Sequence, residues 1–139
     1  MTATVPERQS VSSVRLPVLT ALGALAATAV VAVVDPNEPG NYPTCPFLAV
    51  TGKFCPGCGS LRAVHALTRG DVSTALGLNV LTVLAVVPVV VMWGLWLRRS
   101  YTGAPRRWAA PAAAIWSLLV VVLAFTVLRN LPVSAVLAP

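Results

Sequence analysis

Three long apolar segments are separated by polar segments along the chain. The apolar segments comprise residues 16–34, 78–97 and 108–128, and none of them contains a charged residue. About twenty helical residues, at about 1.5 Å rise each, span the roughly 30 Å hydrocarbon core of a bilayer. Backbone groups cannot remain unpaired in lipid, so such segments must be helical. The pattern therefore predicts an all-α integral membrane protein with three transmembrane helices, the second of them kinked at Pro88.

The polar segments predict a tail, a loop and one further helix. Residues 1–14 are rich in Ser and Thr, and we expect a disordered cytoplasmic tail ahead of a single membrane domain at 15–139. Residues 35–77 form a long loop that begins with several prolines and asparagines. Within it, residues 61–68 place apolar and basic side chains on opposite sides, which predicts a short amphipathic surface helix. Asp71 is a suitable cap for the helix that follows.

Composition and charge support a membrane location. The chain is 57% hydrophobic and 10% charged, whereas about a quarter of the residues in a soluble domain are charged. The net charge of +6 would favour nucleic-acid binding in a soluble protein. Here the basic residues flank the apolar segments, so we interpret them as determinants of orientation in a lipid bilayer and expect no nucleic-acid partner.

The arginines also predict the orientation. Residues 98–107 carry four arginines and no acid, and the tail adds Arg8 and Arg15. The positive-inside rule places these two regions in the cytoplasm, which leaves the 35–77 loop and the C-terminus outside a bacterial plasma membrane. A cleaved signal sequence is the alternative for the first apolar segment, and it would leave the loop on the same side.

The 35–77 loop holds all the cysteines of the chain and its histidine. Cys45, Cys55 and Cys58 are the only cysteines, and His65 is the only histidine. The C-x2-C spacing is usual for zinc, and the four residues form a Cys3His set. If the helix extends back to Cys58, His65 lies roughly 10 Å further along its axis, too far to share an ion. The metal prediction therefore rests on the three cysteines, with zinc as the candidate ion.

Two alternatives to a metal site remain open. An extracytoplasmic location favours oxidation, so Cys45 could pair with Cys55 or with Cys58 and leave one odd thiol. A reactive thiolate is the other alternative, because Cys58 precedes a helix start and Arg62 follows one turn later, which would lower the pKa of the thiol. Among these readings the sequence favours a structural role for the cysteines.

Several polar residues are predicted to have structural or interaction roles: Arg62, Arg69, Asp71, Arg129 and Asn130. Arg129 and Asn130 end the third apolar segment, on the predicted side of the cysteine loop. Arg129 either extends to lipid phosphate or donates hydrogen bonds to carbonyls of that loop and holds it against the bundle.

No motif for a specific reaction is present. The sequence contains no phosphate-binding glycine loop, no HExxH, no GxSxG and no paired carboxylates. We therefore expect no catalytic residues and lean against an enzyme. The predicted function is a non-catalytic accessory or assembly subunit of a larger membrane complex, for which a respiratory complex is one setting. The alternative is an extracytoplasmic thiol-redox or metal-handling membrane protein that uses Cys45, Cys55 and Cys58.

The order of motifs resembles a bacterial family of small membrane proteins, of the domain-of-unknown-function 2752 type. The shared positions are Cys45-Pro46-Phe47, Gly52, Cys55-Pro56-Gly57-Cys58-Gly59, Arg62-Ala63, Arg69-Gly70-Asp71, Ala75 and Asn79, with Arg129-Asn130 resembling the family's ending. The chain departs from the family at Leu61, where threonine is usual before the arginine. The resemblance implies a small polytopic membrane protein and no established activity.

Overall fold

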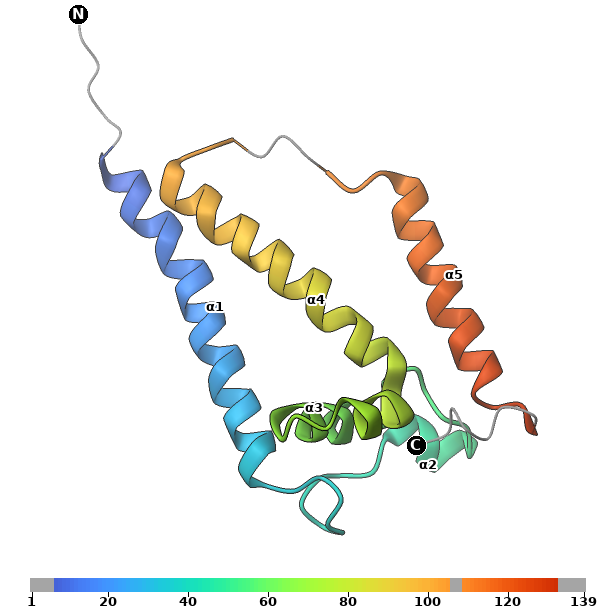
Figure 1. The fold of residues 1–139 in the computed structure, drawn as a ribbon. Coiled ribbons are helices and arrows are strands. Elements are labelled where there is room, and N and C mark those ends of the chain that lie inside the picture. Colours follow the sequence, from blue (N-terminus) through green and yellow to red (C-terminus); the bar gives the residue numbers. More distant parts are fainter. Residues whose placement is uncertain (1–6, 106–108, 133–139) are drawn as a thin grey trace, which may run out of the picture.

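The computed structural model describes residues 7–105 and 109–132, with side chains from residue 14 onward, and these residues are all-helical with no strand. The helices are α1 (Glu7–Val33), α2 (Pro46–Thr51), α3 (Ser60–Thr68), α4 (Val72–Thr102) and α5 (Ala112–Leu128), as shown in Figure 1. Helix α1 begins within the segment predicted as a tail, of which residues 1–6 lie outside the described part of the chain.

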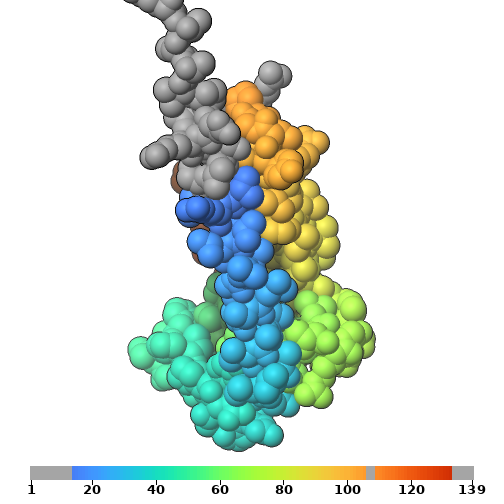
Figure 2. All heavy atoms as spheres, turned by 90° about the vertical axis from the view of Figure 1, so that its left-hand side faces the viewer, coloured from blue at the N-terminus to red at the C-terminus, as the bar shows by residue number. Residues whose placement is uncertain are grey.

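Helices α1 and α4 lie close together at one end of the molecule and diverge toward the other, where α3 lies across the opening between them (Figure 1). At the close end the Trp93 indole N–H donates a hydrogen bond of 3.0 Å to the Pro17 carbonyl. Helix α5 stands apart along most of its length and approaches the rest at its C-terminal end. Viewed from the side, the 35–55 loop and α3 form a broad head below the narrower α1 (Figure 2).

Two helical segments, Val14–Val33 and Val72–Thr102, are long and apolar enough to cross a membrane. Most of their side chains are exposed, unlike those of a core helix in a soluble protein, which indicates association with a membrane. The third predicted span does not reach this length. Helix α5 has 17 residues, or about 25 Å at about 1.5 Å per residue, and it begins only after Pro111. Two spans of sufficient length are thus confirmed, and not three; Trp108, where the third was predicted to begin, lies outside the described residues.

The predicted short helix after the Cys-Pro loop is present as α3, and it packs on α4 through small residues. Ala63 and Ala66 of α3 are buried against Ala75 of α4. Alanine side chains allow the two helix backbones to approach closely. Helix α2 was not predicted, although Pro46 at its first position and the left-handed Gly52 after its end are usual signals of a helix.

Helix α4 is interrupted at Asn79, which the sequence did not predict, whereas the kink expected at Pro88 stays a prediction. Asn79 has non-helical backbone angles (φ −161°, ψ 96°), and Pro88 lies within the helix beyond it. The Asn79 side-chain oxygen accepts a hydrogen bond of 3.1 Å from the Thr82 N–H. This bond caps the longer part of α4 in the manner of an N-cap residue, and it frees the Asn79 amide group to contact the cysteine loop.

Candidate metal centre

The three cysteine side chains converge on one point between α2 and α3. The Sγ atom of Cys55 lies 3.5 Å from that of Cys45 and 3.0 Å from that of Cys58. All three sulfurs lie within 4.8 Å of one another, and all three thiols are free. Four ligands at a Zn–S distance of about 2.3 Å in a tetrahedron place neighbouring sulfurs about 3.8 Å apart. The triangle is therefore of the size that one metal ion requires.

Local backbone geometry presents the sulfurs to the same side. Cys45 precedes the first turn of α2. The Cys55-to-Cys58 segment is a tight turn in which the Cys58 N–H donates to the Cys55 carbonyl at 3.1 Å. The Cys55 N–H in return lies 3.3 Å from the Cys58 sulfur. Gly59 follows with φ of 82°, in the left-handed region that favours glycine, and this residue turns the chain into α3.

Two polar side chains from distant parts of the chain donate hydrogen bonds to the carbonyl groups of this turn. The Asn79 amide of α4 donates to the carbonyls of Pro56 at 2.9 Å and Cys58 at 3.0 Å. Arg129, which follows α5, donates from Nη1 to the carbonyls of Cys55 at 3.0 Å and Cys58 at 3.2 Å. Each carbonyl of the turn that faces the helices thus has a partner, which fixes the positions of the two cysteines.

Arg129 is a buried cation without a paired anion among the described residues. Its exposure is 2%, and its Nε and Nη2 atoms have no hydrogen-bond partner. The guanidinium carbon lies 4.9 Å from the centroid of the Phe125 ring and 5.7 Å from that of the Phe54 ring. These aromatic faces stabilise the charge in part. Of the two alternatives for Arg129, the structure shows the contact with the cysteine loop.

Asn130 reinforces this contact by pairing with the backbone of one loop residue. Its side-chain oxygen accepts from the Phe54 N–H at 2.9 Å, and its amide donates to the Phe54 carbonyl at 2.9 Å. The same amide donates to the Thr126 carbonyl in the last turn of α5 at 2.8 Å. Arg129 and Asn130 together join the end of α5 to the loop, and we refer to these two residues as the α5 clamp.

His65 lies away from the cysteines. It is buried, its Nδ1 atom lies 2.7 Å from the Val31 carbonyl, and its Nε2 atom lies 3.7 Å from an Asp35 carboxylate oxygen. The histidine therefore joins α3 to the end of α1. Hydrogen bonds from Asn37 lower the pKa of Asp35, and the charges of His65 and Arg69 lower it further.

The remaining predicted residues have separate places. Arg69 is exposed at the end of α3. Asp71 caps α4, accepting a hydrogen bond from the Thr74 N–H at 3.0 Å and another from the Ser73 hydroxyl at 2.8 Å. Hydrogen bonds from Thr74, with a smaller effect of Ser73, lower the pKa of Asp71 to about 2. Arg62 lies with Cys45 and Cys58 in the wall of a cavity.

The protonation of the thiols differs from the sequence-based prediction. Burial, followed by the hydrogen bond with Cys55, raises the pKa of Cys58 to about 12, whereas the sequence predicted that Arg62 would lower it. A hydrogen bond from the Leu48 backbone, followed by one from Cys55, lowers the pKa of Cys45. Cys58 is thus a poor candidate for a free reactive thiolate, because it has little tendency to ionise without a cation at the cluster.

Sequence reasoning did not assign site roles to Asn79, Phe54 or Phe125. A polar signal was available for Asn79, which lies between Leu78 and Val80 in a largely apolar segment. Such a residue is costly in lipid and therefore has a partner. No comparable signal marks the two phenylalanines, because aromatic residues are common at the ends of membrane helices.

Fold and site define a small all-helical protein with two helices of membrane-spanning length and a three-cysteine cluster beside them. Residues 45–93 match the model of a family described as "Protein of unknown function (DUF2752)". The match confirms the resemblance drawn from the Cys-Pro motifs; it covers the cluster, α3 and Asn79, but not the α5 clamp. No curated protein and no solved structure matches the chain.

Proposed function

We propose that the chain is a bacterial plasma-membrane protein that binds one thiophilic metal ion, zinc in the first place, through Cys45, Cys55 and Cys58. The main support for this proposal is that three free cysteine sulfurs lie within 4.8 Å of one another. A disulfide would use two of the three and leave the third without a role. Thiolate ligands select zinc or copper(I) over harder cations, which defines the class of ion.

The buried cation of the α5 clamp supports this proposal. Three thiolates and one divalent ion carry a net charge of −1, and Arg129 binds the carbonyls of two of the three ligand residues. A cation that is 2% exposed is costly unless a negative charge lies nearby. A metal–thiolate centre supplies that charge, whereas three neutral thiols or a disulfide do not.

The arrangement of the helices favours a topology in which the cysteine loop and the C-terminal end of α5 lie on the same, extracytoplasmic side. The loop follows the end of α1, and the end of α5 reaches the same loop (Figure 1). Arg98 and Arg99 lie at the opposite end of α4, where the positive-inside rule places the cytoplasm. In this proposal the N-terminal tail is cytoplasmic.

An accessory or assembly role in a larger membrane complex is the second candidate, and α5 favours it. From Ala112 to Val121 every side chain of this helix is exposed, although all but one of these residues are apolar. A helix that lacks packing within its own chain is suited to another membrane subunit. In that setting the metal centre fixes the shape of the loop that the partner contacts, as structural zinc sites do.

Metal titration of the purified protein tests the proposal. Metal-free protein in mild detergent is titrated with Co²⁺ and then with Zn²⁺, and binding is followed by the sulfur-to-cobalt charge-transfer bands and by native mass spectrometry. We expect one ion per chain in the wild type, and weaker charge-transfer bands in each Cys→Ser variant, which retains two of the three sulfurs. His65→Gln is the matched control and keeps the site, because His65 is engaged with α1. Charge-transfer bands of wild-type intensity in the Cys→Ser variants contradict the proposal. An intact disulfide in protein alkylated in native membranes also contradicts it, and supports a thiol-redox role.

A further inference from the structure

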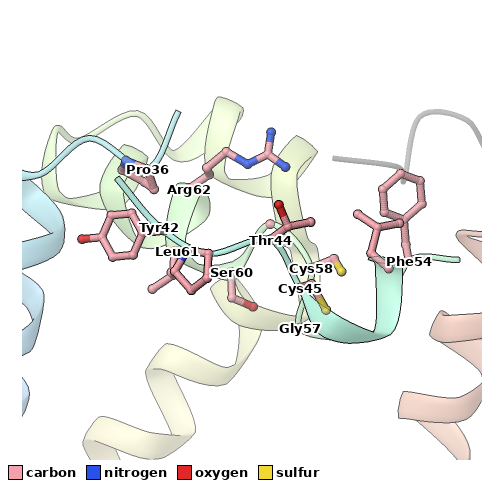
Figure 3. Close-up of a pocket in the computed structure, with 13 residues that line it drawn as sticks. Pro36, Tyr42, Thr44, Cys45, Phe54, Gly57, Cys58, Ser60, Leu61 and Arg62 are labelled. Carbon is pink, nitrogen blue, oxygen red and sulfur yellow. The ribbon is translucent and has the colours of Figure 1, made fainter. Parts of the chain in front are cut away.

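A cavity of about 420 Å³ lies against the cysteine cluster. Cys45 and Cys58 form part of its wall, together with the first turn of α3 and the segment that leads from α1 into the loop (Figure 3). Apolar side chains line much of the rest, among them Leu48 and Phe54. The volume falls within the range of pockets that bind small molecules.

In the part of the chain that the structure describes, the cluster offers three ligands and no fourth. Among the described residues, no other histidine, cysteine or acid belongs to the group that holds Cys45, Cys55 and Cys58. His65, the obvious candidate, is bound to the Val31 carbonyl. Metal sites with three protein ligands keep their remaining position for water or substrate. Because two of the ligand residues line the cavity, a molecule within it has access to that position.

Arg62 supplies a second recognition element in the same wall. It is half-buried at the start of α3, and no hydrogen bond or ion pair engages its side chain among the described residues. The described residues that line the cavity include no acid. A guanidinium group in a partly apolar pocket recognises a carboxylate in bidentate fashion.

We propose that the cavity binds a small molecule that carries both a thiol and a carboxylate. The inference rests on the metal site proposed above. The ligand's sulfur takes the fourth position on the ion, since a thiophilic ion with three thiolates favours a fourth soft ligand, and its carboxylate pairs with Arg62. In the exchange a metal–water bond breaks, a metal–sulfur bond forms, and the thiol proton leaves to bulk water, with no change in oxidation state.

The test uses Co²⁺-loaded full-length protein and a series of mercapto acids with two to six carbons, beginning with 3-mercaptopropionate. 2-Mercaptoethanol lacks the carboxylate and propionate lacks the thiol. The visible d–d bands of cobalt report the change from three sulfur ligands to four, and equilibrium dialysis shows that the ion stays on the protein. We expect the best mercapto acid to bind at least tenfold more tightly than 2-mercaptoethanol, as a charge-assisted contact implies, and propionate to leave the spectrum unchanged.

Variants of two arginines test the role of Arg62 in ligand binding, and the charge-transfer bands of the wild type test the metal site independently. Arg62→Gln is expected to abolish the preference for the acid, Arg62→Lys to retain part of it, and Arg69→Gln to retain all of it, because Arg69 lies outside the cavity. If Co²⁺ added to the wild-type protein without any thiol gives no charge-transfer bands, the metal site itself is refuted. Three outcomes overturn the ligand inference and leave the metal site standing. They are normal bands that no mercapto acid changes, loss of the ion to the free thiol, and an unchanged preference for the acid in Arg62→Gln.

Discussion

Replacement of Arg129 by methionine is expected to loosen the cysteine loop without unfolding the helices. Methionine retains much of the apolar volume between Phe54 and Phe125 but removes the guanidinium. Two hydrogen bonds to loop carbonyls are lost, and bonds from a charged donor contribute about 1.5–3 kcal/mol each. The stacking on two rings adds about 1 kcal/mol, and relief of the buried charge offsets part of the loss. A net cost of about 3 kcal/mol corresponds to roughly a 100-fold change in the opening equilibrium of the loop.

Hydrogen exchange of the metal-free protein in detergent measures this opening. Peptides that cover residues 52–60 contain amides bonded within the turn, and local opening exposes them to solvent. We expect their exchange to accelerate by up to 100-fold in Arg129→Met, while peptides from α1 keep their rates. Arg98→Met is the matched control, because Arg98 is exposed at the end of α4 distant from the loop. Rates within twofold of wild type in Arg129→Met would refute the clamp as an energetic contact.

Three further substitutions test the contacts of Asn130, Asn79 and Asp71. Asn130→Asp keeps the acceptor for the Phe54 N–H but loses the donor to its carbonyl, so exchange of the 52–56 peptide is expected to rise about tenfold, whereas an unchanged rate argues against the pairing. Asn79→Ala removes the cap at the Thr82 N–H and two bonds to the loop, and calorimetry in detergent is expected to show a lower unfolding temperature. The folded pKa of Asp71, about 2, lies below its ordinary value of 3.8, so its stabilising effect is complete above about pH 4 and is lost as the pH falls toward 2. The stability difference between wild type and Asp71→Asn, followed by circular dichroism, should therefore shrink over that window, and a difference independent of pH would contradict the cap.

The sequence predicted those features that depend on neighbouring residues. Two of the three apolar segments became helices of spanning length, and the start of α3 and the Asp71 cap followed from local signals. The convergence of the cysteines was a hypothesis with alternatives, because spacing alone does not fix the path of the chain between Cys45 and Cys55. The two residues of the α5 clamp were proposed for structural roles, but their partners in the loop lie 71 to 76 positions earlier in the chain.

Other features were beyond local reasoning for physical reasons. The interruption of α4 at Asn79 was not predicted, because it depends on the bonds that the Asn79 amide donates to carbonyls of the loop. The pKa of Cys58 was predicted from one nearby arginine, although burial by distant segments has the larger effect and the opposite sign. In both cases a tertiary contact outweighs the signal from neighbouring residues.

X-ray absorption spectroscopy of the zinc-loaded protein tests the central claim most directly. The account predicts three sulfur neighbours at about 2.3 Å and one lighter neighbour at about 2.0–2.2 Å, with the sulfur contribution reduced to two in Cys45→Ser. Three sulfurs in the wild type require Cys45, Cys55 and Cys58 to share one ion, as their separations suggest. A shell of nitrogen and oxygen only, or a sulfur count that Cys45→Ser leaves unchanged, would contradict the account.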